Sequence, residues 1–370
     1  MSDIEPSPVT PNRIESIDVL RGFDMFWIIG GGAIFASLDK VYNNTITGTI
    51  KEQLNHVPWR GFQFEDLIMP LFMFIVGVVM PYSFDKRLGR GHSKNRILAH
   101  VLFRAVVLFI LGMVAQGRLL ELDLSRLHIY CNTLQAIAAG YVIAAVALLA
   151  FRPAGQVVVC VVLMLVYWGL MALVPAPGHA AGDLTQDGNL AIYIDRLILG
   201  RFQDQTHYTW ILSSMTFGST VLMGVLAGRW LQSGRGGFVK AAGLVAAGAI
   251  CVCVGMAWDW IFPIIKHLWT SSFVMLSGGI CLVLLGLFYL VVDVWGLRRW
   301  AFGFKVIGMN AIFVYMITHL WNFQNMGGVF VKGLDKWLGP WDNFAHAAAG
   351  FAIVWLILLY MYRKKTFVKI

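Results

Sequence analysis

The sequence predicts an all-α integral membrane protein that crosses the bilayer about ten times. Three observations predict this class: the 370 residues are 58% hydrophobic, only 13% are charged, and the mean hydropathy is +0.69. A soluble domain carries about 25% charged residues, which it needs to cover a surface that faces water. The composition therefore excludes an ordinary soluble enzyme, a disordered protein and a small secreted scaffold.

Ten apolar stretches recur along the chain, each close to the ~20 residues that a spanning helix requires. Their approximate bounds are 16–38, 61–83, 98–116, 131–150, 155–174, 209–230, 240–258, 270–292, 303–320 and 344–362. No composition break or low-complexity linker divides the chain, so we predict one transmembrane domain over 1–370. Residues 1–13 are expected to form a flexible cytoplasmic N-terminus, and 175–208 the longest loop on the opposite side.

The basic surplus of the chain is interpreted as membrane topology and not as nucleic-acid binding. The formal net charge is +9, from 29 Lys and Arg against 20 Asp and Glu. Ten spans place both termini on one side, and the connections on that side hold seventeen Lys and Arg against ten on the other. Because cytoplasmic loops concentrate Lys and Arg, both termini are predicted to be cytoplasmic.

Ionisable side chains within the spans are the first candidates for a functional site, because a charge at mid-bilayer costs about 2.5–3.5 kcal/mol. In the first span, Asp18 and Arg21 are three residues apart and can pair on a helix. A structural ion pair at the cytoplasmic mouth explains them as well as a functional site does. Arg104, in the third span, is the other basic residue inside a predicted helix.

A second cluster, "NHVPWRGFQFEDLIMP", begins at Asn55 and enters the second span. Pro58 suits a first helical turn, and Trp59 is placed like an interfacial anchor. On a helix, Asp66 would share a face with Trp59 two turns deeper, beneath His56. A histidine that titrates near neutrality is the usual general base. A loop histidine that only caps the helix is the structural alternative.

A third cluster, "GMNAIFVYMITH", lies in the ninth span and contains Asn310 and His319. Nine residues of helix separate them by about 13 Å, so they cannot act on one atom but can line one channel. For Asn310 the structural alternative is a hydrogen bond between helices. Gln135 in the fourth span and Lys266 before the eighth are weaker signals, since a lysine there can simply extend to the surface.

At these residues the chain resembles heparan-α-glucosaminide N-acetyltransferase and its bacterial relatives among the transmembrane acyltransferases. The matching stretches run from about residue 13 to the end: "SIDVLRGF", "HVPWRGFQFEDLIMPLFMFIVG", "YIDRLILG", "KHLWTSSFV", "VVDVWG", "GMNAIFVYMITH" and "YRKKTFVKI". The chain departs from the lysosomal enzyme by lacking its extra N-terminal lumenal region and first helix, and by a shorter 175–208 loop. We therefore expect a multi-pass protein of the bacterial inner membrane with 175–208 in the periplasm.

The resemblance implies transfer of an acetyl group from cytosolic acetyl-CoA to the amine of a glucosamine-type sugar on the far side of the membrane. It places His56 on the family's active-site histidine. The expected catalytic residues are His56, Asp66, Asn310 and His319. The residues expected to bind acetyl-CoA are Arg21, Arg104, Gln135, Arg298, Arg299 and Lys305, and those expected to bind the acceptor are Asn55, Trp59, Lys266 and Trp269.

The expected chemistry follows from these residue types. Arginine forks suit the phosphates of CoA. His56 would deprotonate the amine with Asp66 orienting the ring, and Asn310 or His319 would donate to the developing oxyanion. Alternatively, His56 itself carries the acetyl group between two half-reactions. No metal is expected, and a homodimer is compatible with the apolar outer helices.

Two other function classes remain open at this stage. Ten spans with intramembrane polar residues also suit a sugar or peptide transporter, although no internal repeat or paired broken helices are visible. O-acylation of a cell-surface glycan would keep the same fold and donor.

Overall fold

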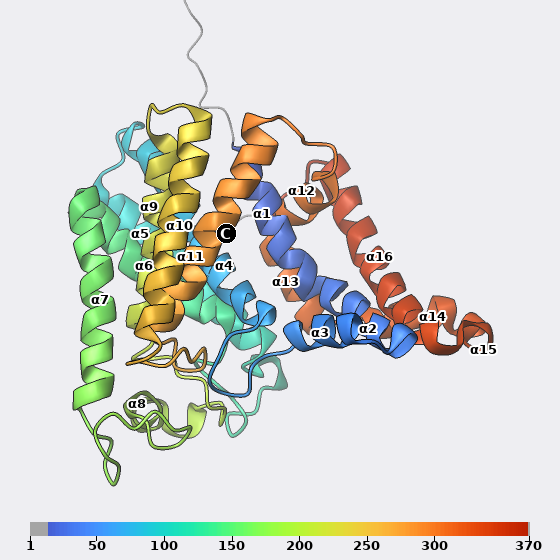
Figure 1. The fold of residues 1–370 in the computed structure, drawn as a ribbon, viewed down its shortest axis with the longest axis horizontal. Helices are drawn as coiled ribbons and strands as arrows, with labels where there is room; N and C mark the ends of the chain where they lie inside the picture. The colour runs from blue at the N-terminus through green and yellow to red at the C-terminus, as the bar shows by residue number, and fades with distance from the viewer. Residues whose placement is uncertain (1–13, 369–370) are drawn as a thin grey trace, which may run out of the picture.

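The computed structural model describes residues 14–368, in which no strand occurs, and the protein is 74% helical (Figure 1). The all-α class is confirmed. The flexible N-terminus expected at 1–13 lies outside the described residues.

Long helices run between two ends of a bundle (Figure 1). They are α1 (Glu15–Phe26), α4 (Ile68–Leu88), α5 (Lys94–Ala115), α6 (Thr133–Ala150), α7 (Pro153–Leu173), α9 (Ser214–Gln232), α10 (Gly237–Trp258), α11 (Ser271–Tyr289) and α16 (Asp342–Arg363). The shorter helices are α2 (Gly32–Tyr42), α3 (Thr45–Gln53), α8 (Leu190–Leu199), α12 (Phe302–Gly308), α13 (Ala311–Leu320), α14 (Phe323–Val331) and α15 (Asp335–Leu338).

The described part of the chain holds eight helical segments that are long and apolar enough to cross a membrane, or nine if α12 and α13 form one bent span. This shows a multi-pass membrane protein, while the number ten stays a prediction. The connections after α4, α6 and α9 gather at the end where α1 begins, and α8 lies at the opposite end (Figure 1). The predicted grouping of loops is therefore present, and the cytoplasmic assignment of one end stays a prediction.

The bundle has a buried centre and an outer ring. In the segment Phe64–Leu88, 78% of the most apolar window is buried, whereas in α10 only 17% is. The central helix α9 packs against α4, α6 and α7 and is rich in buried Ser, Thr and Gly. This explains why α9 is less apolar than the outer helices, which present their side chains to lipid.

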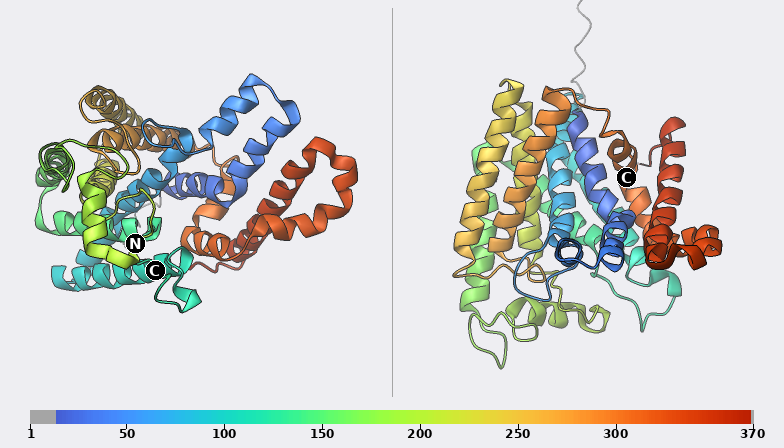
Figure 2. Two further views of the ribbon diagram at one scale, coloured as in Figure 1. Left: turned by 90° about the horizontal axis from the view of Figure 1, so that it is seen from below. Right: turned by 45° about the vertical axis from the view of Figure 1, so that its right-hand side comes forward.

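Two predicted spans are interrupted. A π-helical turn, Trp27–Gly31, separates α1 from α2, and Gly30 there has φ 139°, which favours glycine. From this turn α2 and α3 project as one arm, and α14 and α15 form a second arm beside it (Figure 2). The sequence predicted neither arm. The first predicted span, 16–38, runs through the break at Trp27–Gly31, and 321–343 has no apolar stretch of spanning length.

The ninth predicted span is broken, and the expectation of one continuous helix over 303–320 was wrong. α12 and α13 meet at an angle of 76° across Met309 and Asn310. The Asn310 amide donates to the carbonyl of Thr366 (3.2 Å) and accepts from the N–H of Val368 (2.9 Å). The side chain thus binds the returning C-terminal tail at the break. Asn310 directly precedes α13, which contains His319, so the predicted spacing of about 13 Å along one helix is retained.

Glycines bring α4 and α9 into close contact. A Cβ on Gly224 would lie 2.0 Å from the carbonyl oxygen of Phe74, and a Cβ on Gly77 would lie 2.0 Å from that of Val221. Gly224 and Gly228 also form the small-xxx-small spacing that lets membrane helices approach closely. Because α4 follows directly after the segment that contains Asp66, this contact helps to position Asp66.

Gly224→Val is expected to destabilise the protein by about 1–3 kcal/mol, because the added side chain forces α4 and α9 apart. Thermal unfolding in detergent measures the effect. Gly169→Val on α7 is the control, since no atom from another part of the described structure lies within 4 Å of a Cβ placed there. Equal unfolding temperatures for the two variants would contradict the packing argument.

Candidate active site

A cavity of about 550 Å³ opens at the α8 end of the bundle. Segments far apart in the sequence line it, among them His56, the start of α4, the loop before α6, the loop before α9, and α13. The polar side chains in its lining are His56, Glu65, Gln116, Arg118, His128, Thr133, Asp204, Thr206, Tyr208, Lys266, Tyr315 and His319.

Asp66 lies at the centre of the loop that carries His56. A 3₁₀ turn, Phe64–Leu67, opens the helix, and the Asp66 carboxylate accepts the backbone N–H of Gln63 (3.1 Å) and of Val57 (3.4 Å). Its other oxygen lies 3.0 Å from Nδ1 of His56. The Asp66 side chain is 1% exposed and that of His56 is 49% exposed, so a buried carboxylate supports a histidine that faces the cavity.

The predicted partnership of His56 with Asp66 is present, but the geometric argument for it was wrong. Residues 57–63 are not helical, so Pro58 does not begin a helix, and Trp59 and Asp66 do not share a helical face. The loop instead folds back on itself, and the hydrogen bonds to Asp66 hold it closed.

A second loop brings Lys266 to the same carboxylate. Arg60 forms an isolated antiparallel bridge with Ile265, and the N–H of Gly61 donates to the carbonyl of Ile264 (2.9 Å). Lys266 Nζ consequently lies 3.3 Å from Oδ1 of Asp66 and 3.1 Å from Nδ1 of His56. Lys266 is buried, with 6% exposure, and this burial lowers the pKa of its ammonium group, which the Asp66 carboxylate opposes.

The contacts of Asp66 select one tautomer of His56. A lysine ammonium group only donates and a carboxylate only accepts. If Nδ1–H of His56 and Nζ of Lys266 both donate to Asp66, both contacts of the carboxylate are satisfied, and the 3.1 Å approach of Nζ to Nδ1 is a contact between two donors. The lone pair of His56 then lies on Nε2, where it can accept a proton.

Aromatic rings form a wall beside His56. The ring of His267 lies 5.2 Å from that of Trp59 and 4.2 Å from that of Tyr208, between centroids. Burial, together with the charge of Lys266, lowers the pKa of His267 to about 4, so this ring is neutral near pH 7. Trp59 donates from Nε1 to the carbonyl of Leu184 (3.0 Å), which joins the wall to the 175–208 loop.

The two polar residues of the ninth predicted span have separate positions. His319 lines the cavity and stacks on Tyr315, with ring centroids 4.1 Å apart. Its Nδ1 lies 2.8 Å from the Tyr315 carbonyl oxygen and therefore donates to it. In a neutral ring Nε2 is then an acceptor, so His319 donates to an oxyanion only when it is protonated. Asn310 binds the C-terminal tail and does not line this cavity.

A second cavity, of about 460 Å³, lies at the opposite end of the bundle and has a basic lining. Arg298, Arg299 and Lys305 surround Glu15, whose carboxylate pairs with Arg298 (3.3 Å) and Lys305 (2.5 Å). Asp293 accepts the backbone N–H groups of Glu15 and Ser16, both at 3.0 Å, and so fixes the start of α1 beside this cavity. Three of the predicted CoA-binding residues are thus brought together.

The other predicted residues lie outside both cavities. Gln135 is buried, and its amide binds the backbone of Cys131, Ile129 and Phe109, so it holds the loop before α6 instead of reaching a ligand. Trp269 is buried and donates to Thr220 (3.0 Å), which leaves it no surface for substrate in this structure.

Three further predicted residues also lie apart from the cavity linings. Arg104 lies over the ring of Tyr141 at 5.0 Å. Asn55 donates to the carbonyl of Lys51 (2.6 Å), and Arg21 lies 3.6 Å from Asp18. The predicted pairing of Asp18 with Arg21 is therefore present.

The sequence did not point to Glu65, Arg118, His128 or Asp204, although all four line the first cavity. Glu65 adjoins Asp66 in an apolar segment, and that signal could have identified it. The others lie in loops, where charged residues are ordinary.

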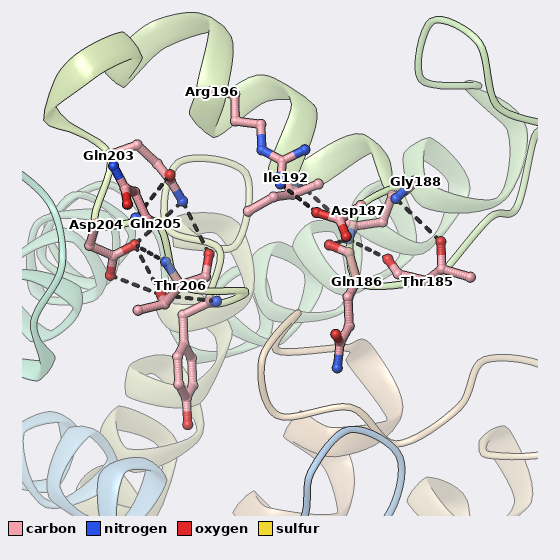
Figure 3. A network of polar contacts seen from close by, with 12 residues as sticks. Thr185, Gln186, Asp187, Gly188, Ile192, Arg196, Gln203, Asp204, Gln205 and Thr206 are labelled. Carbon is pink, nitrogen blue, oxygen red and sulfur yellow. Dashed lines mark hydrogen bonds and ion pairs between the residues drawn. The ribbon is translucent and has the colours of Figure 1, made fainter.

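Figure 3 shows two separate polar networks in the 175–208 loop, one around Asp187 and Arg196 (2.6 Å) and one around Asp204 and Thr206.

Comparisons with known proteins support the resemblance seen in the sequence. The human heparan-alpha-glucosaminide N-acetyltransferase is 26% identical over 438 aligned positions, which cover 100% of this chain and 62% of the human protein. The mouse protein of the same name is 25% identical, with 97% of this chain and 61% of the mouse protein covered. The chain thus spans less than two thirds of the length of these relatives.

A family model described as the catalytic region of heparan-alpha-glucosaminide N-acetyltransferase matches residues 13–242. Since this match covers more than half of the chain, the protein belongs to the heparan-α-glucosaminide N-acetyltransferase family.

Proposed function

We propose that the protein is a transmembrane N-acetyltransferase of the bacterial inner membrane. It moves the acetyl group of cytosolic acetyl-CoA to the amine of a glucosamine-type sugar on the periplasmic side. The observation that carries this proposal is His56, held at Nδ1 by the buried Asp66 and facing a cavity with Nε2 free. The names of the human and mouse relatives support the choice of reaction.

In the proposed reaction, the amine nitrogen attacks the thioester carbon, a C–N bond forms and the C–S bond breaks. Nε2 of His56 takes the proton that the amine loses and returns it to the departing sulfur, so CoA leaves as the thiol. The Asp66 carboxylate stabilises the imidazolium that forms, because it already accepts the Nδ1–H. A general base of this kind contributes about 10²–10⁴ to the rate.

Lys266 is the best-placed group to stabilise the oxyanion of the tetrahedral intermediate. Lys266 lines the cavity with Nζ 3.1 Å from His56, and because Lys266 is only 6% exposed, its positive charge is weakly screened by water. Asn310 has no contact with this cavity, and the neutral ring of His319 presents an acceptor. We therefore assign to Lys266 the role that the sequence suggested for Asn310 or His319.

The basic cavity at the other end of α1 is the proposed dock for the CoA phosphates. Arginine forks bind phosphate oxygens through two parallel hydrogen bonds. Glu15 at this cavity and Ile28 at the first cavity are separated by thirteen residues, or about 20 Å along a helix. This division suits a donor whose charged nucleotide stays in cytosolic water while its neutral arm reaches inward.

Direct transfer from the thioester to the amine is the proposed route, with His56 acting as a base. Labelled acetyl-CoA without acceptor is then expected to leave no acetyl group on the protein. Mass spectrometry of the peptide that contains His56 tests this. An acetylated His56 that turns over when glucosamine is added would instead establish the two-step route.

His56→Ala is expected to lower acetyl transfer at least 10²-fold while the protein stays folded and binds CoA, because only the proton acceptor is removed. Transfer of labelled acetyl from acetyl-CoA to glucosamine in proteoliposomes measures the effect.

His179→Ala is the matched control for this variant, since His179 also pairs with a carboxylate, Asp183, at 3.0 Å but lies outside the cavity. Full activity of folded His56→Ala protein would refute the site. Sugar uptake without label transfer by the wild type would favour a transporter, and transfer only to polymer hydroxyl groups would favour an O-acyltransferase.

Arg299→Ala is expected to weaken acetyl-CoA binding about tenfold, because a charge-assisted hydrogen bond contributes about 1.5–3 kcal/mol. Calorimetry on the detergent-solubilised protein measures the affinity. Arg235→Ala is the control, since Arg235 belongs to the connection between α9 and α10, which lies at the same end of the bundle (Figure 1), but its guanidinium lies over the ring of Trp230 at 4.3 Å. Arg104→Ala in the same experiment tests the sequence-based prediction for Arg104, and unchanged affinity in Arg299→Ala would remove the basic cavity as the donor site.

A further inference from the structure

We propose that Arg118 makes the outer cavity selective for an acceptor sugar that carries an anionic substituent: a phosphate, a sulfate or a carboxylate. The inference rests on the proposed function and deepens it, because it assigns the chemical class of the acceptor. It comes from a guanidinium group that lines the same cavity as His56 and that the proposed reaction does not use.

The backbone around Arg118 is held firmly in an uncommon conformation. Arg118 has φ 57°, in the left-handed region that non-glycine residues rarely adopt. The N–H of His128 donates to the carbonyl of Gly117 (3.0 Å), and Asn132 donates to the side chain of Gln116 (2.6 Å). These bonds close the loop between α5 and α6, so the backbone that carries Arg118 is held in place at the cavity.

Arg118 is only weakly engaged within the protein. Its Nε lies 3.9 Å from Glu121, at the limit of an ion pair, whereas Arg126 contacts the same carboxylate at 2.9 Å. Glu121 is therefore neutralised mainly by Arg126. The Arg118 side chain is 45% exposed, so its fork is available to a ligand in the cavity.

The neighbouring acid does not cancel this charge. Asp204 accepts from the backbone N–H of Thr206 (3.2 Å) and from its hydroxyl group (2.9 Å), as Figure 3 shows. Burial raises the pKa of Asp204, and no ion pair between Asp204 and Arg118 occurs among the residues that the structure describes. His128, bonded to the carbonyl of Gln203 (3.2 Å), lies on the same wall.

Geometry and charge together fit an oxyanion on the sugar. Lys266 and His56 also line the cavity, and Glu65 is the remaining acid there. A planar guanidinium binds phosphate, sulfate or carboxylate through two hydrogen bonds, whereas a lysine offers only a point charge. An amino sugar would then be held at two points: its anionic group would bind Arg118, and its amine would lie at His56.

The experiment compares acceptors in acetyl transfer by the full chain in proteoliposomes. Glucosamine is the neutral acceptor; glucosamine 6-phosphate, glucosamine 6-sulfate and muramic acid carry the three anions. The wild type is expected to prefer at least one anionic acceptor about tenfold in kcat/KM, and the best of the three identifies the anion.

Arg118→Ala is expected to lower kcat/KM for that anionic acceptor about tenfold or more, and to leave neutral glucosamine and the KM for acetyl-CoA within twofold. Arg118→Lys is expected to recover only part of the preference. Arg196→Ala is the matched control, because Arg196 also pairs with a carboxylate, Asp187 (2.6 Å), but does not line the cavity. Calorimetric binding of the preferred anionic sugar to Arg118→Ala protein gives a readout that does not depend on turnover.

The outcomes separate the two proposals. A wild type that acetylates no amino sugar refutes the proposed function. A wild type that acetylates glucosamine without preferring any anionic acceptor, or whose preference survives Arg118→Ala, overturns the assignment of Arg118. A raised KM for acetyl-CoA in Arg118→Ala also overturns it, because Arg118 would then serve the donor.

Discussion

The buried carboxylate of Asp66 is the interaction on which the site depends. It accepts two backbone N–H groups from its own loop, the ring of His56 and the ammonium group of Lys266 from a second loop. Each of these donors offsets part of the cost of burying a negative charge. Without Asp66, Lys266 would be a buried charge without its carboxylate partner, and His56 would lose the bond that fixes its tautomer. One side chain therefore joins the fold of two loops to the protonation state of the proposed base.

Asp66 can serve in this way because the helices beneath it are closely packed. α4 begins directly after the 3₁₀ turn that contains Asp66. The glycine contacts between α4 and α9 fix the position of α4 along the bundle and thereby the position of that turn. The loop that carries Lys266 runs between α10 and α11, which also meet at glycines such as Gly248 and Gly279. Without bulky side chains between these helices, the ends of the loops have little freedom, and distances near 3 Å can be maintained across the site.

The sequence predicts the helical class and the apolar segments, because length and hydropathy are local properties, and the resemblance makes His56 a candidate for the site. It predicts partners less well. The pairing of His56 with Asp66 was anticipated from a helix that does not exist there, and Lys266 was assigned to the acceptor although it contacts both residues. Gln135 and Trp269 were expected to contact ligands, but both are buried and form hydrogen bonds within the protein. A buried polar residue must find a partner, but the sequence does not say whether that partner is a ligand, a loop or a neighbouring helix.

The break between α12 and α13 shows how such a failure arises and what it implies for the reaction. The Asn310 amide forms hydrogen bonds with the C-terminal tail at the break between α12 and α13. The segment that was expected to form one side of a channel is therefore bent by 76° at this point. The bend leaves His319 at the outer cavity and Lys305, on α12, at the basic cavity. In the proposed reaction α12 would then serve the donor at one end and α13 the acceptor at the other, while the segment from Glu15 to Ile28 reaches both cavities. The tail held by Asn310 is therefore part of the architecture that places α12 at one cavity and α13 at the other, although it lines neither cavity.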